Sequence, residues 1–250
     1  MRYIFVSIVL TLVCACGGGG GGSAGPSPLE QVAQQILETC GATTIDSYLE
    51  LLAIFEGLLD PAETDPQTFM ILVTIPADAG VDWELDLDAD PGPDVLGRLQ
   101  FVDAAGDPET TVDVDQLQTG FDDLDLLLPT VPDGTSMVFA MLRGAPPPFE
   151  GSFTFDVTGS AVSQVAGDFL IQDLLCEANL SFSGASLANV GGAVPTLVIT
   201  ITLTAPEGDL AGTVTLDGTN IAVVEVSVDG SAQTFSFEIN LTTGAVTAAP

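Results

Sequence analysis

After residue 68, hydrophobic and polar residues alternate along most of the chain, and this period of two predicts β-strands. The clearest case is the segment 197–204, in which leucine and isoleucine at odd-numbered positions alternate with valine and threonine at even-numbered ones. The other predicted strands cover 69–75, 81–88, 97–102, 136–143, 151–158, 169–174, 179–183, 212–216, 222–228 and 234–241, with a last short strand near the C-terminus. Such a series of short antiparallel strands predicts a β-sandwich or a curved, barrel-like sheet.

Turn residues separate the last of these strands. Asp217-Gly218 and Asp229-Gly230 each stand between two alternating segments, and Thr243-Gly244 precedes the final one. An Asp-Gly pair in this position is a strong signal for a β-hairpin. The C-terminal part is therefore predicted to be a meander in which each strand pairs with the next.

The period changes to that of a helix before residue 62. Ser27 and Glu30 form a Ser-x-x-Glu capping box, which predicts a helix start. Apolar residues recur at helical spacing up to Gly41, which we expect to end the first helix, and a second helix is expected from about Thr44. The fold class predicted is mainly β, with a helical hairpin at 29–61 lying on a β domain at 62–250.

The N-terminus has the features of an export signal. Arg2 is followed by a short apolar run over 3–13, which is too short to cross a bilayer core of about 30 Å as a helix. The sequence Val13-Cys14-Ala15-Cys16 resembles the lipobox of bacterial lipoproteins. The resemblance implies a signal peptide at 1–15, cleavage before Cys16, acylation of Cys16 with fatty acids such as palmitate, and a glycine-rich tether at 16–28.

The same resemblance implies a location. Gly17 follows the lipidated cysteine, whereas an aspartate at that position is associated with retention in the inner membrane. We therefore expect an outer-membrane lipoprotein that faces the periplasm or the cell surface. Its contact with the membrane would be made by the lipid on Cys16.

Charge excludes several classes of partner and of chemistry. The chain has 35 acidic and 3 basic residues, a formal net charge of −32, and neither histidine nor lysine. Nucleic acid and anionic headgroups require a basic surface and are not expected as partners. Without histidine or lysine there can be no Ser-His-Asp triad, imidazole metal ligand, Schiff base or phosphate-binding P-loop. An enzyme would have to use carboxylates, serines or a metal held by oxygen atoms.

Two cysteines remain in the part of the chain that follows Cys16. Cys40 and Cys176 form an even pair, and an exported protein folds in an oxidising compartment. We expect a disulfide between them; the alternative is a pair of buried free thiols.

The most acidic segment is 81–94. As a strand, it would direct its apolar residues inward and its carboxylates outward. The inward residues would be Val81, Trp83, Leu85 and Leu87, and the outward ones Asp82, Glu84, Asp86 and Asp88. Asp86, Asp88, Asp90 and Asp94 are candidate oxygen ligands for Ca²⁺ around the following turn. The segment does not follow the EF-hand pattern, so a solvated acidic face is favoured over a specific calcium site. No other cofactor is predicted.

Three classes of function are compatible with these features. The preferred one is a non-catalytic protein of the cell envelope that binds another protein, a polymer or cations, or has a structural role. The second is a carrier of an apolar ligand inside a curved sheet capped by the helices. The third and least favoured is a carboxylate-dependent hydrolase, for which the sequence offers no catalytic residues.

Overall fold

The computed structural model describes residues 25–59, 69–75, 80–86, 95–114, 127–144, 148–172, 175–190 and 195–249. It contains one twelve-stranded antiparallel sheet in which the strands follow one another in chain order. The strands are β1 (Phe69–Ile75), β2 (Gly80–Asp86), β3 (Val95–Val102), β4 (Ser136–Arg143), β5 (Phe149–Thr158), β6 (Ala161–Gln172), β7 (Glu177–Ala185), β8 (Thr196–Ala205), β9 (Gly208–Asp217), β10 (Ile221–Val228), β11 (Thr234–Asn240) and β12 (Val246–Ala248).

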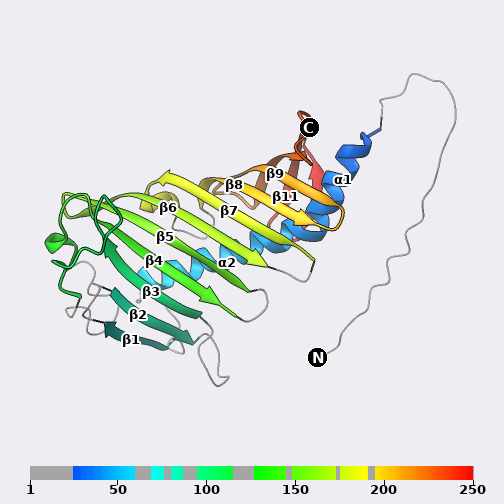
Figure 1. Ribbon diagram of the computed structural model, residues 1–250. Helices are drawn as coiled ribbons and strands as arrows, with labels where there is room; N and C mark the ends of the chain where they lie inside the picture. The colour runs from blue at the N-terminus through cyan, green and yellow to red at the C-terminus, as the bar shows by residue number, and fades with distance from the viewer. Residues whose placement is uncertain are drawn as a thin grey trace, which may run out of the picture.

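The sheet is curved and open. Figure 1 shows it as a bent band with the N-terminal helix running along the inner side of the curve. Each strand pairs with its sequence neighbour, and within the described residues no pairing joins β1 to β12. Of the two architectures predicted, the structure therefore has the single curved sheet.

The helical region begins where the sequence predicts. The Ser27 hydroxyl accepts a hydrogen bond from the Glu30 backbone N–H at 3.2 Å, and the Glu30 carboxylate accepts one from the Ser27 N–H at 3.1 Å. This capping box satisfies two N–H groups that the first helical turn leaves without partners. Three helical segments follow without a break: α1 (Pro28–Ile36), the π-helical turn η1 (Leu37–Gly41) and α2 (Ala42–Leu59).

The predicted end of the first helix at Gly41 is wrong, and with it the hairpin. Gly41 is buried and helical, and a Cβ atom there would lie 3.0 Å from Leu37 Cδ2 and 3.4 Å from Ile239 Cδ1 on β11. Glycine within a helix costs about 1 kcal/mol relative to alanine. At Gly41 the missing side chain lets the helix approach the sheet closely at β11. The glycine therefore allows the helix to pack against the sheet and does not end it.

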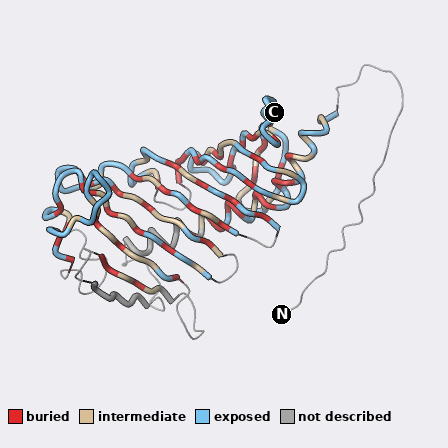
Figure 2. The backbone as a smooth tube through the Cα atoms, viewed as in Figure 1, coloured by how far each residue is buried: buried red, intermediate tan, exposed pale blue. Residues whose placement is uncertain are grey.

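One face of the sheet holds the core. Along β8, Leu197, Ile199, Ile201 and Leu203 are buried and the even-numbered residues between them are exposed, as predicted. Figure 2 shows buried and exposed positions alternating along many of the other strands whose side chains are described. We call the buried side the inner face and the opposite side the outer face. The inner face contacts α1 along β9–β12 and η1 at β8. Its largest fully buried side chains on the strands are Trp83, Phe101, Phe139, Phe153, Phe155, Phe169 and Phe237.

Glycines on the inner face make room for these large side chains. Gly97 on β3 lies opposite Trp83 on β2, and a Cβ atom at Gly97 would overlap the indole ring. Gly212 on β9 instead permits a close approach of the neighbouring backbone, because a Cβ atom there would overlap the carbonyl of Glu225 on β10. Glycine within a strand permits such close approach and marks places where a sheet bends.

The expected C-terminal hairpins are confirmed. Asp229 and Gly230 both have positive φ angles, 48° and 70°, and connect β10 to β11. They form a tight turn that the Ser231 N–H closes by donating to the Val228 carbonyl at 2.8 Å, within a connection of residues 229–233. Aspartate and glycine tolerate positive φ better than most other residues. Gly218 and Gly244, in the two neighbouring turns, also have positive φ angles of 81° and 69°.

Candidate functional site: a groove on the outer face

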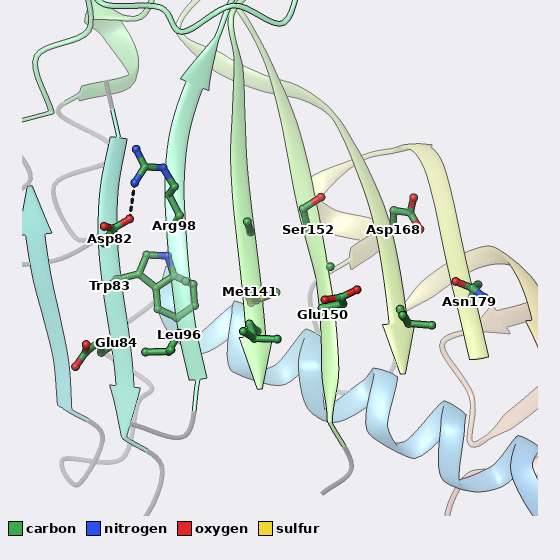
Figure 3. Close-up of a pocket in the computed structure, with 15 residues that line it drawn as sticks. Asp82, Trp83, Glu84, Leu96, Arg98, Met141, Glu150, Ser152, Asp168 and Asn179 are labelled. Carbon is green, nitrogen blue, oxygen red and sulfur yellow. Dashed lines mark hydrogen bonds and ion pairs between the residues drawn. The ribbon is translucent and has the colours of Figure 1, made fainter. Parts of the chain in front are cut away.

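The candidate site is a groove of about 780 Å³ that crosses β2 to β7. Figure 3 shows it from the side opposite the helix. Antiparallel register arranges its outer-face side chains in two neighbouring rows, each with one residue per strand. The first row is Asp82, Arg98, Ala140, Ser152 and Asp168, and the second is Glu84, Leu96, Leu142, Glu150, Leu170 and Asn179.

The first row contributes an ion pair and a depression in the groove's surface. The Arg98 guanidinium donates to the Asp82 carboxylate at 2.6 Å across β2 and β3, and both side chains are partly exposed. Next along the row are two small residues, Ala140 and Ser152, which lie opposite each other on β4 and β5. Because both side chains are small, the outer surface of the sheet is depressed here, between the longer side chains of Arg98 and Asp168.

The second row contributes an apolar strip. Leu96 on β3 lies directly opposite Leu142 on β4, and their exposed fractions are 44% and 48%. Each leucine also has a carboxylate opposite it on its other side, Glu84 beside Leu96 and Glu150 beside Leu142. Beyond Glu150, Leu170 on β6 adds a third leucine to the row.

The groove is acidic overall. Its lining includes four carboxylates, from Asp82, Glu84, Glu150 and Asp168, and one guanidinium, from Arg98. The single cation is already paired with Asp82. Glu84, Glu150 and Asp168 therefore give the groove a negative potential that attracts cations.

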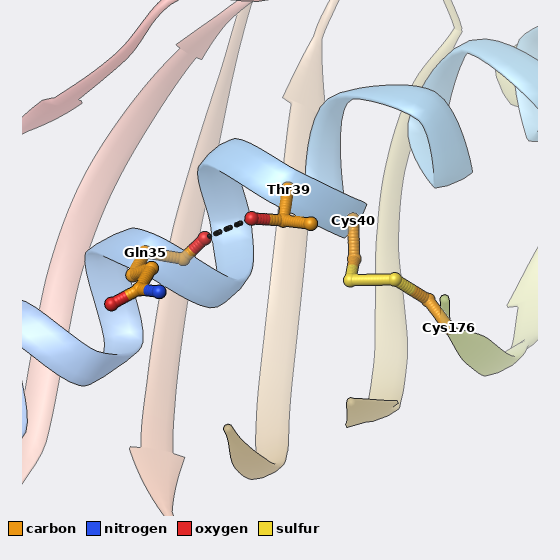
Figure 4. The surroundings of a disulfide bond; sticks show 4 residues. All are labelled: Gln35, Thr39, Cys40 and Cys176. Carbon is orange, nitrogen blue, oxygen red and sulfur yellow. Dashed lines mark hydrogen bonds between the residues drawn. A yellow bond between two sulfur atoms is a disulfide. The ribbon is translucent and has the colours of Figure 1, made fainter. Parts of the chain in front are cut away.

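The disulfide predicted from the sequence is present. Cys40 and Cys176 are bonded, with their Cα atoms 6.0 Å apart (Figure 4). Cys40 lies in η1, and Cys176 immediately precedes β7. The bond closes a sequence separation of 136 residues and fastens the helix to the inner face near the middle of the sheet.

Between α2 and the sheet lies a buried tyrosine. Tyr48 is 0% exposed, and its ring packs edge-on against Phe169 of β6, with the centroids 5.9 Å apart. Its hydroxyl has no hydrogen-bond partner in the described part of the chain. Burial raises the pKa of Tyr48 far above its usual range, because the charged phenolate would lose its hydration there.

Several predicted site residues lie outside the described residues. They are the proposed lipidation site Cys16 and three of the candidate calcium ligands, Asp88, Asp90 and Asp94; of Asp86, only the backbone in β2 is described. The start of this segment is as predicted, with Val81 and Trp83 buried and Asp82 partly exposed. Elsewhere, the described residues contain no group of three or more acidic or cysteine side chains placed to hold a metal ion.

The groove was not predicted from the amino-acid sequence. Leu96, Leu142 and Leu170 occupy outward positions of strands whose inward positions are also apolar. Leucine at an outward position was the available signal, but only the register shows that the three residues share one row. That row joins strands as distant in sequence as β2 and β7.

Comparison of the chain with protein-family models, with curated proteins and with solved structures found no match. None of the helices in the described part of the chain combines the length and hydrophobicity that a bilayer span requires.

Proposed function

We propose that the protein is a lipid-anchored protein of the bacterial cell envelope, attached to the outer membrane through Cys16, that acts by binding and not by catalysis. The anchor follows from the lipobox resemblance of residues 13–16. The binding surface is the groove that crosses β2 to β7 on the outer face of the sheet.

The observation that carries the envelope location is the Cys40–Cys176 disulfide. Structural disulfides persist in oxidising compartments and are rare in the reducing cytosol. The bond therefore supports export, which the N-terminal apolar run predicts independently. A long closed loop of this kind also stabilises a domain that must fold outside the cytosol.

The form of the groove supports binding in preference to catalysis. Carboxylates that act as general acids or bases work best in recesses that exclude water and alter their proton affinity. In this groove the Asp82 side chain is 42% exposed and Leu142 is 48% exposed, so these lining side chains are open to solvent. Exposed apolar side chains beside unneutralised carboxylates are better suited to contacting a partner.

A second candidate function is transport of an apolar ligand between the helix and the sheet. The observation that favours it is Tyr48, whose buried hydroxyl has no partner among the described residues and lies at an aromatic inner face. The polar end of a lipid-like ligand could satisfy this hydroxyl. The disulfide opposes this function in part, because it ties the helix to the sheet at Cys40.

Native mass spectrometry of the full chain, extracted from its own envelope with a mild detergent, distinguishes the two. A protein or polymer partner that co-purifies supports the binding role. A stoichiometric apolar small molecule that is lost in Tyr48→Phe supports the carrier. The protein alone, with neither adduct, would contradict both.

A further inference from the structure

The outer-face groove has a regular order of charge and hydrophobicity that indicates what it binds. Across the strands, its second row reads carboxylate, leucine, leucine, carboxylate, leucine, amide, from Glu84 on β2 to Asn179 on β7. We propose that this groove binds a basic, amphipathic segment of a partner protein, in extended conformation along the row. The inference deepens the binding role proposed above and rests on it.

The exposed leucines supply the apolar part of the contact. Leu96 and Leu142 are neighbours across β3 and β4, and together they form an apolar surface with about half of each side chain open to solvent. Removing apolar surface from water is favourable. An apolar side chain of a partner that covers this pair is therefore held without a specific hydrogen bond.

The carboxylates supply the orientation. Glu84 and Glu150 stand at the two ends of the leucine pair, separated by three strand intervals, or about 14 Å at about 4.8 Å per interval. An extended chain advances about 3.4 Å per residue and directs alternate side chains to one side. Two cations four residues apart, with an apolar residue midway, would therefore place their charges at the two glutamates and the apolar side chain over the leucines.

Charge selects a basic partner and disfavours others. The groove has four carboxylates and one arginine, which is paired with Asp82, and the chain as a whole has a formal charge of −32. Acidic proteins, nucleic acids and anionic lipid surfaces are repelled, whereas a basic segment is steered toward the groove. The neighbouring low surface at Ala140 and Ser152 leaves room for the backbone of such a segment.

The test is binding of a labelled synthetic peptide, measured by fluorescence anisotropy with the full lipidated chain in non-ionic detergent at low salt. The probe is Lys-Ser-Leu-Ser-Lys-Ser-Leu-Ser-Lys, which has cations four residues apart with leucine midway. A peptide of the same composition, Lys-Lys-Lys-Leu-Leu-Ser-Ser-Ser-Ser, keeps the charge but not the spacing. We expect the spaced peptide to bind at least about fivefold more tightly than the permuted one.

Substitutions in the groove test its carboxylates and its leucines separately. Glu84→Gln with Glu150→Gln should weaken binding of the spaced peptide about tenfold, and Leu142→Thr about fivefold. The matched controls are Glu225→Gln on β10 and Val198→Thr on β8, which lie on the outer face away from the groove. They should change the dissociation constant less than twofold.

Three results would overturn the proposal: equal binding of the two peptides, equal loss in control and groove variants, or no effect of Leu142→Thr. Each would show that the overall negative charge, and not this groove, attracts cations. Membrane fractionation of the same preparations tests the anchor separately, because none of these substitutions touches Cys16. Failure of the groove would therefore leave the proposed envelope location standing.

Discussion

Cys40 in the helix and Cys176 before β7 are joined by a disulfide, although they are 136 positions apart in the sequence. The bond links the N-terminal helical segment of the described residues to the middle of the sheet that curves around it. It fixes η1 over the central strands, and the capping box at Ser27 fixes the beginning of the same helical segment.

The first prediction concerns this bond. Replacing both cysteines, Cys40→Ala with Cys176→Ala, should lower the free energy of unfolding by about 3–5 kcal/mol, because the reduced chain regains the entropy of a long open loop. Denaturant unfolding measures the loss, and non-reducing peptide mapping of the unaltered protein should recover the cross-linked pair. Two alkylatable thiols in the freshly isolated, folded protein would contradict the structure.

A second prediction concerns the contact between Trp83 and Gly97. Gly97→Ala should destabilise the protein by about 1–3 kcal/mol, because the added methyl group overlaps the indole and the ring must move. Gly144→Ala is the matched control, since no atom lies within 4 Å of a Cβ placed there. Thermal unfolding compares the two variants. Equal melting temperatures would show that Trp83 is not held against Gly97.

Tyr48 gives a third prediction, which concerns pH. Residues 17–250 contain no other tyrosine, so ultraviolet absorbance of the processed protein reports this phenol alone. Burial raises the pKa of Tyr48, so the neutral form is the one that folding favours. Its contribution to stability is complete below the unfolded-state pKa of about 10 and is lost as pH rises above that value. We expect no tyrosinate absorbance until alkali unfolds the chain, and tyrosinate in a still-folded protein would contradict burial.

The hydroxyl of Tyr48 can be tested further by substitution. Tyr48→Phe removes a buried polar atom that has no partner among the described residues, so the melting temperature should stay the same or rise. A marked fall in melting temperature would show that the hydroxyl makes a stabilising hydrogen bond.

The fourth prediction concerns salt and divalent cations. With a formal charge of −32 the protein repels itself, and about 0.15 M salt reduces the screening length to about 8 Å, so NaCl should raise the melting temperature. A specific site in segment 81–94 would make Ca²⁺ more effective than Mg²⁺, which loses its water reluctantly, and Asp88→Asn with Asp90→Asn would remove the difference. We expect identical Ca²⁺ and Mg²⁺ curves, and a clear preference for Ca²⁺ would establish the site.

The sequence predicts the strands well, because the alternation of apolar and polar residues within one strand indicates which of its faces is buried. Alternation along β8 and the Asp229-Gly230 turn are local signals, and both are confirmed. The Cys40–Cys176 pair could be predicted because only two cysteines follow Cys16.

The sequence did not predict the continuous helix or the groove, because both depend on contacts between distant residues. Glycine by itself favours the end of a helix, as predicted for Gly41. In the structure, Leu37 and Ile239 of β11 lie so close to Gly41 that a residue without a side chain fits best within the helix. Leu96 and Leu142 become one apolar surface only when β3 and β4 pair in this register. A shift of a single residue would turn one of them to the inner face.

The lipid anchor at Cys16 is tested most directly by comparing Cys16→Ser with Cys14→Ser. Membrane fractionation and mass spectrometry of the N-terminal peptide make the comparison. We predict that the unaltered protein and Cys14→Ser begin at an acylated Cys16 and sediment with the outer membrane, whereas Cys16→Ser is recovered in the soluble fraction. A Cys16→Ser protein that remains in the membrane with its first fifteen residues uncleaved would contradict this prediction, because the apolar N-terminal run would then be the anchor.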